Sequence, residues 1–278
     1  MAGCELQLAG RTLRSERPAL IMGIVNATPD SFFAGSRGGV EQALRLIDEG
    51  ADIIDIGGES TRPGSRYVDA EEELRRVLPV IEGIRRHSFV AISVDTRKKA
   101  VMEAAYNAGA DIVNDVSALE DDGEMAAFAA AKEIPVILMH KRGIPADMQR
   151  DTSYRDVCAE VGSYLESRAE YALSQGIAPE KIIVDPGIGF GKDLAANRAL
   201  IAGCGRLCGG RFPVLMALSR KSCIGEMTGE AVDGRLYGTL AACLIAVQRG
   251  ARLLRVHDVA PCRNTLDVLK SFIDGGVL

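Results

Sequence analysis

Polar residues recur near the ends of apolar, β-branched runs along the whole chain. Carboxylate, amide, imidazole and guanidinium groups are all represented, and each follows a run that favours a buried strand. Any one of them is equally well explained as a hydrogen-bonded core group or a loop cap. Their recurrence at the corresponding end of nearly every run instead indicates a shared ligand site. These residues are Asn26, Asp55, Asp95, Asn114, His140, Asp185, Ser219, Arg255 and His257.

The runs that carry these residues alternate with longer amphipathic stretches, without a linker-like or low-complexity interruption. Near-continuous apolar strands are typical of parallel sheets that helices cover on both sides. The alternation predicts one α/β domain over residues 1–278, a (β/α)8 TIM barrel, whose active site lies where the strands end. The predicted strands are Ala19–Asn26, Asp52–Gly57, Ala91–Thr96, Ile112–Val116, Pro135–His140, Ile182–Gly187, Val214–Ser219 and Arg252–His257.

Local signals support the helices between these strands. A helix over Ala70–Arg86 begins with three glutamates and ends in two arginines, which matches the helix dipole. Gly50, Gly109 and Gly176 each stand between a helical stretch and a strand, where a left-handed residue closes a helix. The segment Cys4–Leu13 predicts a short N-terminal hairpin beneath the barrel.

Composition excludes several classes of partner. The net charge is −5 and the charged residues, 26% of the chain, are interspersed, so no basic face for nucleic-acid phosphates is expected. Met1–Pro18 lacks an apolar signal core, and no apolar run reaches the roughly 18 residues that span a bilayer. We therefore expect a cytoplasmic protein without a membrane partner.

The cysteines and histidines do not form a recognisable metal motif. The seven cysteines are irregularly spaced, which favours reduced, mostly buried thiols over a disulfide framework. Cys204 and Cys208 have the spacing of half a zinc site, but no second pair or nearby histidine completes it.

Several longer segments have the residue order of one enzyme family. The intervening segments 93–96, 114–115 and 138–140 also fit, and together the matches run in order from about residue 19 to about residue 260. As a set they resemble dihydropteroate synthases. The main segments are MGIVNATPDSF (22–32), DIGGESTRPG (55–64), DPGIGFGK (185–192), SRKS (219–222) and RVHD (255–258).

The resemblance implies an enzyme of folate biosynthesis. Its reaction joins (7,8-dihydropterin-6-yl)methyl diphosphate to 4-aminobenzoate and releases diphosphate. We expect a dissociative substitution, because the electron-rich dihydropterin stabilises a positive methylene carbon, and no nucleophile and base pair is evident for a covalent intermediate.

The resemblance also assigns the pterin pocket. Carboxylate and amide groups pair with the aminopyrimidinone edge, a lysine reaches the ring carbonyl and N5, and larger side chains enclose the ring faces. For Asp185 the alternative is that it only shapes a turn, and for Asp95 that it caps a helix near Thr96. The implied pterin contacts are Asp95, Asn114, Met139, Asp185, Phe190, Lys221 and Arg255.

The leaving diphosphate needs cations and donors where negative charge grows. The resemblance implies Asn26, Arg62, Arg255 and His257 for this role, together with a Mg²⁺ ion whose first protein ligand is Asn26. An alternative is that Arg255 and His257 brace the last helix through Asp258. Their i, i+2 spacing places both on one side of a strand, which favours the anion site.

The second substrate site is assigned in the same way. Ser222 begins a predicted helix, whose first N–H groups can receive a carboxylate, and Arg220 is either a neighbouring charge or a solvated one. The chain departs from the usual family pattern at Ala34, where an aspartate is customary. The implied 4-aminobenzoate contacts are Phe32, Thr61, Arg62, Pro63, Lys221 and Ser222.

Further expectations follow from the resemblance. It implies a homodimer and competitive inhibition by sulfonamides, which mimic the aminobenzoate. One rival is a corrinoid-dependent pterin methyltransferase, which would not need the segments 219–222 and 255–258. Another is a non-catalytic folate-binding subunit, which would bind reduced folate without turnover.

Overall fold

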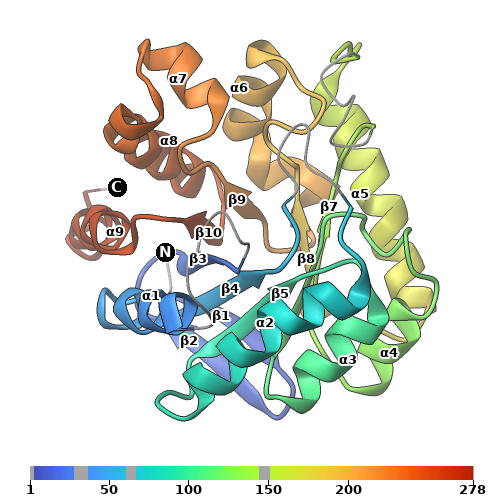
Figure 1. Ribbon diagram of the computed structural model, residues 1–278. Coiled ribbons are helices and arrows are strands. Elements are labelled where there is room, and N and C mark those ends of the chain that lie inside the picture. The colour runs from blue at the N-terminus through green and yellow to red at the C-terminus, as the bar shows by residue number, and fades with distance from the viewer. Residues whose placement is uncertain (1–2, 28–36, 61–66, 144–150, 278) are drawn as a thin grey trace.

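The chain folds as the predicted barrel. The structure is a computed structural model that describes residues 3–27, 37–60, 67–143 and 151–277 (Figure 1). Eight parallel strands lie in the order β8-β7-β6-β5-β4-β3-β10-β9, and a bridge between Val184 and Val214 joins the two ends of this order. The strands are β3 (Leu20–Asn26), β4 (Ile53–Gly57), β5 (Ala91–Asp95), β6 (Ile112–Asp115), β7 (Val136–Met139), β8 (Ile182–Asp185), β9 (Leu215–Ala217) and β10 (Leu253–Val256).

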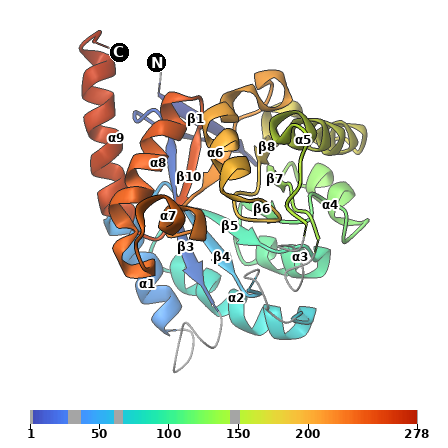
Figure 2. The same cartoon turned by 90° about the horizontal axis from the view of Figure 1, so that it is seen from above.

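Helices surround the strands, as the view from above shows (Figure 2). In α2, Asp69 caps the first turn by accepting from the amide of Glu72, and the predicted acidic first turn follows. The helices are α1 (Arg37–Asp48), α2 (Ala70–Arg85), α3 (Lys99–Asn107), α4 (Met125–Ala131), α5 (Val157–Ser174), α6 (Leu194–Gly203), α7 (Ser222–Thr228), α8 (Leu236–Gln248) and α9 (Val259–Asp274). The predicted left-handed glycines are confirmed, with φ of +99° at Gly50, +109° at Gly109 and +93° at Gly176.

The lower half of the barrel interior is apolar. The predicted hairpin is present as β1 (Cys4–Leu8) paired antiparallel with β2 (Arg11–Ser15), slightly longer than expected. Leu6 and Leu8 of this hairpin pack with the inward-facing residues of the strands and so close the bottom of the barrel. The strand residues of this apolar layer are Leu20, Met22, Ile53, Ala91, Ile112, Ile137, Ile183, Leu215, Ala217 and Leu253.

A polar layer lies above the apolar one. Side chains alternate between the two faces of a strand, so the residue two positions after an inward-facing residue also faces inward. Asp55 follows Ile53, Asn114 follows Ile112, Asp185 follows Ile183 and Arg255 follows Leu253 in this way. In β5, Asp95 lies four residues after the inward-facing Ala91 and so faces inward as well. We call Asp55, Asp95, Asn114, Asp185 and Arg255 the polar layer.

Two further expectations concern membranes and metal. In the described part of the chain no helix is long and apolar enough to cross a membrane. The seven cysteines are free thiols, and Cys204 and Cys208 are buried. Within residues 3–27, 37–60, 67–143 and 151–277, no three or more His, Cys, Asp or Glu side chains group as a metal site.

Candidate active site

Arg255 joins the carboxylates of the polar layer. Its Nε donates to Asp55 Oδ2 at 2.6 Å and its Nη2 donates to Asp95 Oδ2 at 3.0 Å. Asn114 Nδ2 lies 3.3 Å from both carboxylate oxygens of Asp55. Burial is the largest influence on the Asp95 carboxyl and raises its pKa to about 7, although the Arg255 charge opposes this shift. Three predicted pterin contacts therefore lie together, with Asp55 between two of them.

Asp185 and Lys221 lie on the opposite side of the barrel mouth. Asp185 Oδ1 accepts from the Gly187 amide at 2.7 Å, so this residue does shape the turn after β8. Burial raises the pKa of the Asp185 carboxyl, which the charge of Lys221 partly offsets. Burial also lowers the pKa of Lys221 to about 8. The Lys221 ammonium lies 4.9 Å from the centre of the Phe190 ring, which brings two more predicted pterin contacts together.

The remaining described site residues lie around this mouth. Met139 ends β7 beside Asp185 in the sheet register, and Asn26 ends β3 beside Gly57. His257 follows β10, with its Nδ1 3.0 Å from Ser219 Oγ. Ser222 is the first residue of α7, as predicted, and is exposed. Phe32, Ala34, Thr61, Arg62 and Pro63 lie outside the described residues.

Two of the alternative roles are wrong. Asp95 does not cap a helix, because α3 begins only at Lys99 and the Asp95 carboxylate pairs with Arg255. Arg255 does not brace the last helix through Asp258. Instead Asp258 forms a two-bond pair with Arg220, at 2.9 Å and 2.8 Å. The Arg220 guanidinium is thus paired with Asp258, and its side chain remains 30% exposed.

His140 differs from the other strand-end residues. It lies one residue beyond the inward-facing Met139, and its ring makes an edge contact with Tyr164 of α5 at 5.0 Å. Its Nδ1 lies 2.9 Å from Lys192 Nζ. His140 is therefore directed away from the polar layer, toward the helices.

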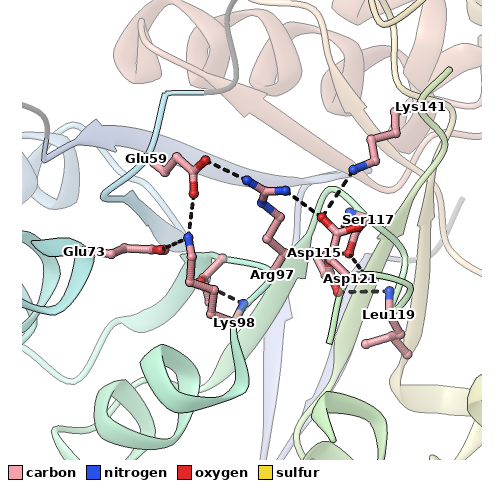
Figure 3. A network of polar contacts seen from close by, with 10 residues as sticks. Glu59, Glu73, Arg97, Lys98, Asp115, Ser117, Leu119, Asp121 and Lys141 are labelled. Carbon is pink, nitrogen blue, oxygen red and sulfur yellow. Dashed lines mark hydrogen bonds and ion pairs between the residues drawn. The ribbon is translucent and has the colours of Figure 1, made fainter. Parts of the chain in front are cut away.

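An ion-pair network joins the loops that follow β4 to β7 (Figure 3). Arg97 pairs with Glu59 at 2.8 Å and with Asp121 at 2.6 Å, and Lys141 lies 3.5 Å from Asp121. Lys98 pairs at 2.6 Å with both Glu59 and the fully buried Glu73 of α2. Since these residues come from four successive strand-end loops, the network holds one side of the barrel rim together.

The sequence did not assign roles to Asp55 or Lys192, although both lie in recognised segments. For Asp55 the available signal was a carboxylate at the end of a predicted strand, which placed it at the active-site face without identifying its partners. The Arg97 and Lys98 network gave no signal, because its partners are distant in sequence.

Comparisons with known proteins agree with this geometry. The family described as "Pterin binding enzyme" matches residues 22–257. A dihydropteroate synthase of Neisseria meningitidis serogroup B is 47% identical over 261 residues, which cover 90% of each chain.

Solved structures are similar over nearly the whole chain. A Xanthomonas albilineans dihydropteroate synthase with 4-aminobenzoic acid has a TM-score of 0.91 and 47% identity, covering 98% of this chain and 99% of that one. A complex of the enzyme from the same organism with 7,8-dihydropteroate has a TM-score of 0.86 and 44% identity, covering 97% and 98%. The chain therefore belongs to the pterin-binding enzymes and, within them, to the dihydropteroate synthases.

The contacts of Asp55 predict the effect of Asp55→Asn. The loss of one charge from a buried ion pair should lower the free energy of unfolding by about 1.5–3 kcal/mol, the typical contribution of a hydrogen bond to a charged group. It should also weaken pterin binding, because Arg255 and Asn114 lose the group that orients them. Urea unfolding and calorimetry measure the two effects.

Asp52→Asn is the matched control. Asp52 lies just before β4, at the opposite end of the barrel, where it accepts from Arg17 and from the Ile21 amide. This variant should lose stability but keep its pterin affinity. Equal pterin affinity in both variants would remove Asp55 from the site.

Proposed function

We propose that the polar layer is where the chain carries out the dihydropteroate synthase reaction. The reaction joins (7,8-dihydropterin-6-yl)methyl diphosphate to 4-aminobenzoate, and releases diphosphate and 7,8-dihydropteroate. The observation that carries this assignment is the cluster of buried carboxylates and a buried amide around Arg255 at the C-terminal ends of the strands. The reaction belongs to folate biosynthesis.

The pterin edge is assigned to Asp185, Asp95 and Asn114. These groups offer acceptors and a donor in fixed positions, and leaving them unpaired beside a poorly matched ligand costs about 1–3 kcal/mol each. Lys221 donates to the ring carbonyl and N5 region. Met139, Phe190 and Arg255 enclose the ring faces, and this choice is supported by the Phe190 and Lys221 contact.

The diphosphate is assigned to the rim beside β3 and β10, with Asn26, Arg62, Arg255 and His257 as its contacts. The amide oxygen of Asn26 is a hard donor that suits Mg²⁺, an ion that commonly takes most of its ligands from phosphate and water. The ion would neutralise part of the charge on the leaving group. Arg255 would contribute only the donor capacity that Asp55 and Asp95 leave free.

The 4-aminobenzoate is assigned to Ser222 and Lys221, together with Phe32, Thr61, Arg62 and Pro63. The amine attacks the methylene carbon after the carbon–oxygen bond breaks, so the enzyme needs no nucleophile of its own. Sulfonamides should compete for this side of the site, because their sulfonyl oxygens occupy positions similar to those of the carboxylate.

A homodimer is supported by two apolar stripes on neighbouring helices. On α8, Tyr237 and Ile245 are exposed at helical spacing, and on α9, Val268 and Phe272 are exposed at i, i+4. The two helices lie side by side in Figure 2. Exposed apolar stripes of this kind are typical of subunit contacts. We therefore assign this face to a second copy of the chain.

A cytoplasmic location, where thiols stay reduced, suits the seven free cysteines.

The function is tested by coupled measurement of diphosphate release. Release should require both the pterin diphosphate and 4-aminobenzoate, because the amine traps the product of bond breaking. Release independent of 4-aminobenzoate, or no release, would contradict the assignment. Methyl transfer from a methylated pterin to a corrinoid would support the rival enzyme.

The dimer is tested with Ile245→Glu in α8. A carboxylate inside an apolar contact must be desolvated, so this variant should sediment as a monomer. Phe89→Glu is the control, since Phe89 is 85% exposed but lies before β5, away from α8 and α9. If the wild-type chain and both variants sediment alike, the assigned face is wrong.

A further inference from the structure

Lys192 is a buried lysine to which the reaction gives no role. The residue is only 3% exposed. Its Nζ lies 2.9 Å from His140 Nδ1, 3.0 Å from the carbonyl oxygen of Gly187 and 2.8 Å from that of Phe190. An ammonium group has three N–H donors, so these three acceptors use all of them.

The contacts of Lys192 close the loop that carries Phe190. Gly187, Gly189 and Gly191 in this loop have φ of +67°, +85° and +64°, and a Cβ at Gly187 would collide with the carbonyl oxygen of His140. The loop has one backbone turn bond, from the Phe190 amide to the Gly187 carbonyl at 3.1 Å, and side chains bond to further carbonyl groups. Lys192 bonds to two of the loop carbonyl groups.

Other side chains bond to two further carbonyl groups of this loop. Lys221 donates to the Ile188 carbonyl, and Tyr154 donates to the Gly191 carbonyl at 3.0 Å. Lys192 also reaches the end of β7, at His140. His140 in turn donates its backbone N–H to the Asp185 carbonyl at 3.0 Å.

The charges around the pair determine which nitrogen of His140 is protonated. Burial and the positive charges of Lys192 and Arg142 lower the pKa of His140 to about 3, so the ring is neutral. Burial, together with the charges of Lys221 and Arg142, lowers the pKa of Lys192 to about 7, while Asp185 opposes that shift. When the lysine is charged, His140 Nδ1 must accept, and the ring proton therefore sits on Nε2.

We propose that Lys192 and His140 are positioning residues for pterin binding. Together they fix the loop between Asp185 and Lys192, and through it the Phe190 ring and the Lys221 ammonium. The pair acts through these groups and does not touch substrate. The inference rests on the proposed function, because it takes Phe190 and Lys221 to be pterin contacts.

Two variants of His140 separate positioning from simple packing. In His140→Asn, Oδ1 replaces Nδ1 as an acceptor for Lys192, whereas His140→Leu has a similar volume and no acceptor. His140→Leu should raise KM for the pterin diphosphate about tenfold, which corresponds to the loss of one charged hydrogen bond. His140→Asn should stay close to wild type, both in this KM and in the KM for 4-aminobenzoate.

Lys181→Met is the matched control for Lys192→Met. Lys181 donates to the carbonyl of Glu133 at the opposite end of β8, so its loss should leave KM for the pterin diphosphate unchanged. Lys192→Met should raise it. Equal KM values in the Asn and Leu variants of His140, or in the two Met variants, would overturn the positioning role. Failure of the wild-type enzyme to release diphosphate would instead overturn the proposed function.

The wild-type protein supplies a test that needs no variant. The chain has three histidines, so ¹⁵N spectra of histidine-labelled protein can be assigned with one substitution each. At pH 6, His140 should be a neutral ring protonated at Nε2. Protonation at Nδ1, or a doubly protonated ring, would contradict the Lys192 contact.

Discussion

Arg255 carries a positive charge inside the barrel, between the carboxylates of Asp55 and Asp95. The Arg255 side chain is only 19% exposed, and a guanidinium so largely removed from water is tolerated only where carboxylates pair with it. Arg255 comes from β10, and its two partners come from β4 and β5. Arg255 and Asp55 are 200 residues apart in the sequence. The interaction therefore forms only when the strands have closed into a barrel, and it orients Asn114 through Asp55.

The apolar layer makes this arrangement possible. Leu6 and Leu8 of the hairpin and the inward-facing strand residues exclude water from the lower half of the barrel. Burial above this apolar layer raises the pKa values of Asp95 and Asp185 and lowers that of Lys221, and so favours the neutral form of each group. A ligand that supplies matching donors, acceptors and charge compensates these groups, so the same burial favours a polar, planar ligand at this depth.

Much of the fold could be predicted from the sequence, because apolar strand runs and the residue types at helix ends are set by residues close together in the chain. Their position at the ends of predicted strands placed Asp55, Asn114, Asp185 and Arg255 at the active-site face of the barrel before their partners were known. Pairing is not local, since it depends on the register and stagger of strands. Arg220 rather than Arg255 pairs with Asp258 for this reason. His140 shows a second limit of prediction from sequence. It lies one residue beyond the inward-facing Met139, so its side chain points the opposite way, toward Tyr164.

The central claim is that the polar layer binds the pterin, and calorimetry on Asp185→Asn tests it most directly. Asparagine keeps an oxygen for the Gly187 amide, so the turn and the fold should persist, but it replaces the other carboxylate oxygen with a donor. The dissociation constant for a dihydropterin alcohol should rise at least about tenfold, or 1.4 kcal/mol, with an unchanged unfolding midpoint. An unchanged dissociation constant in the folded variant would contradict the account.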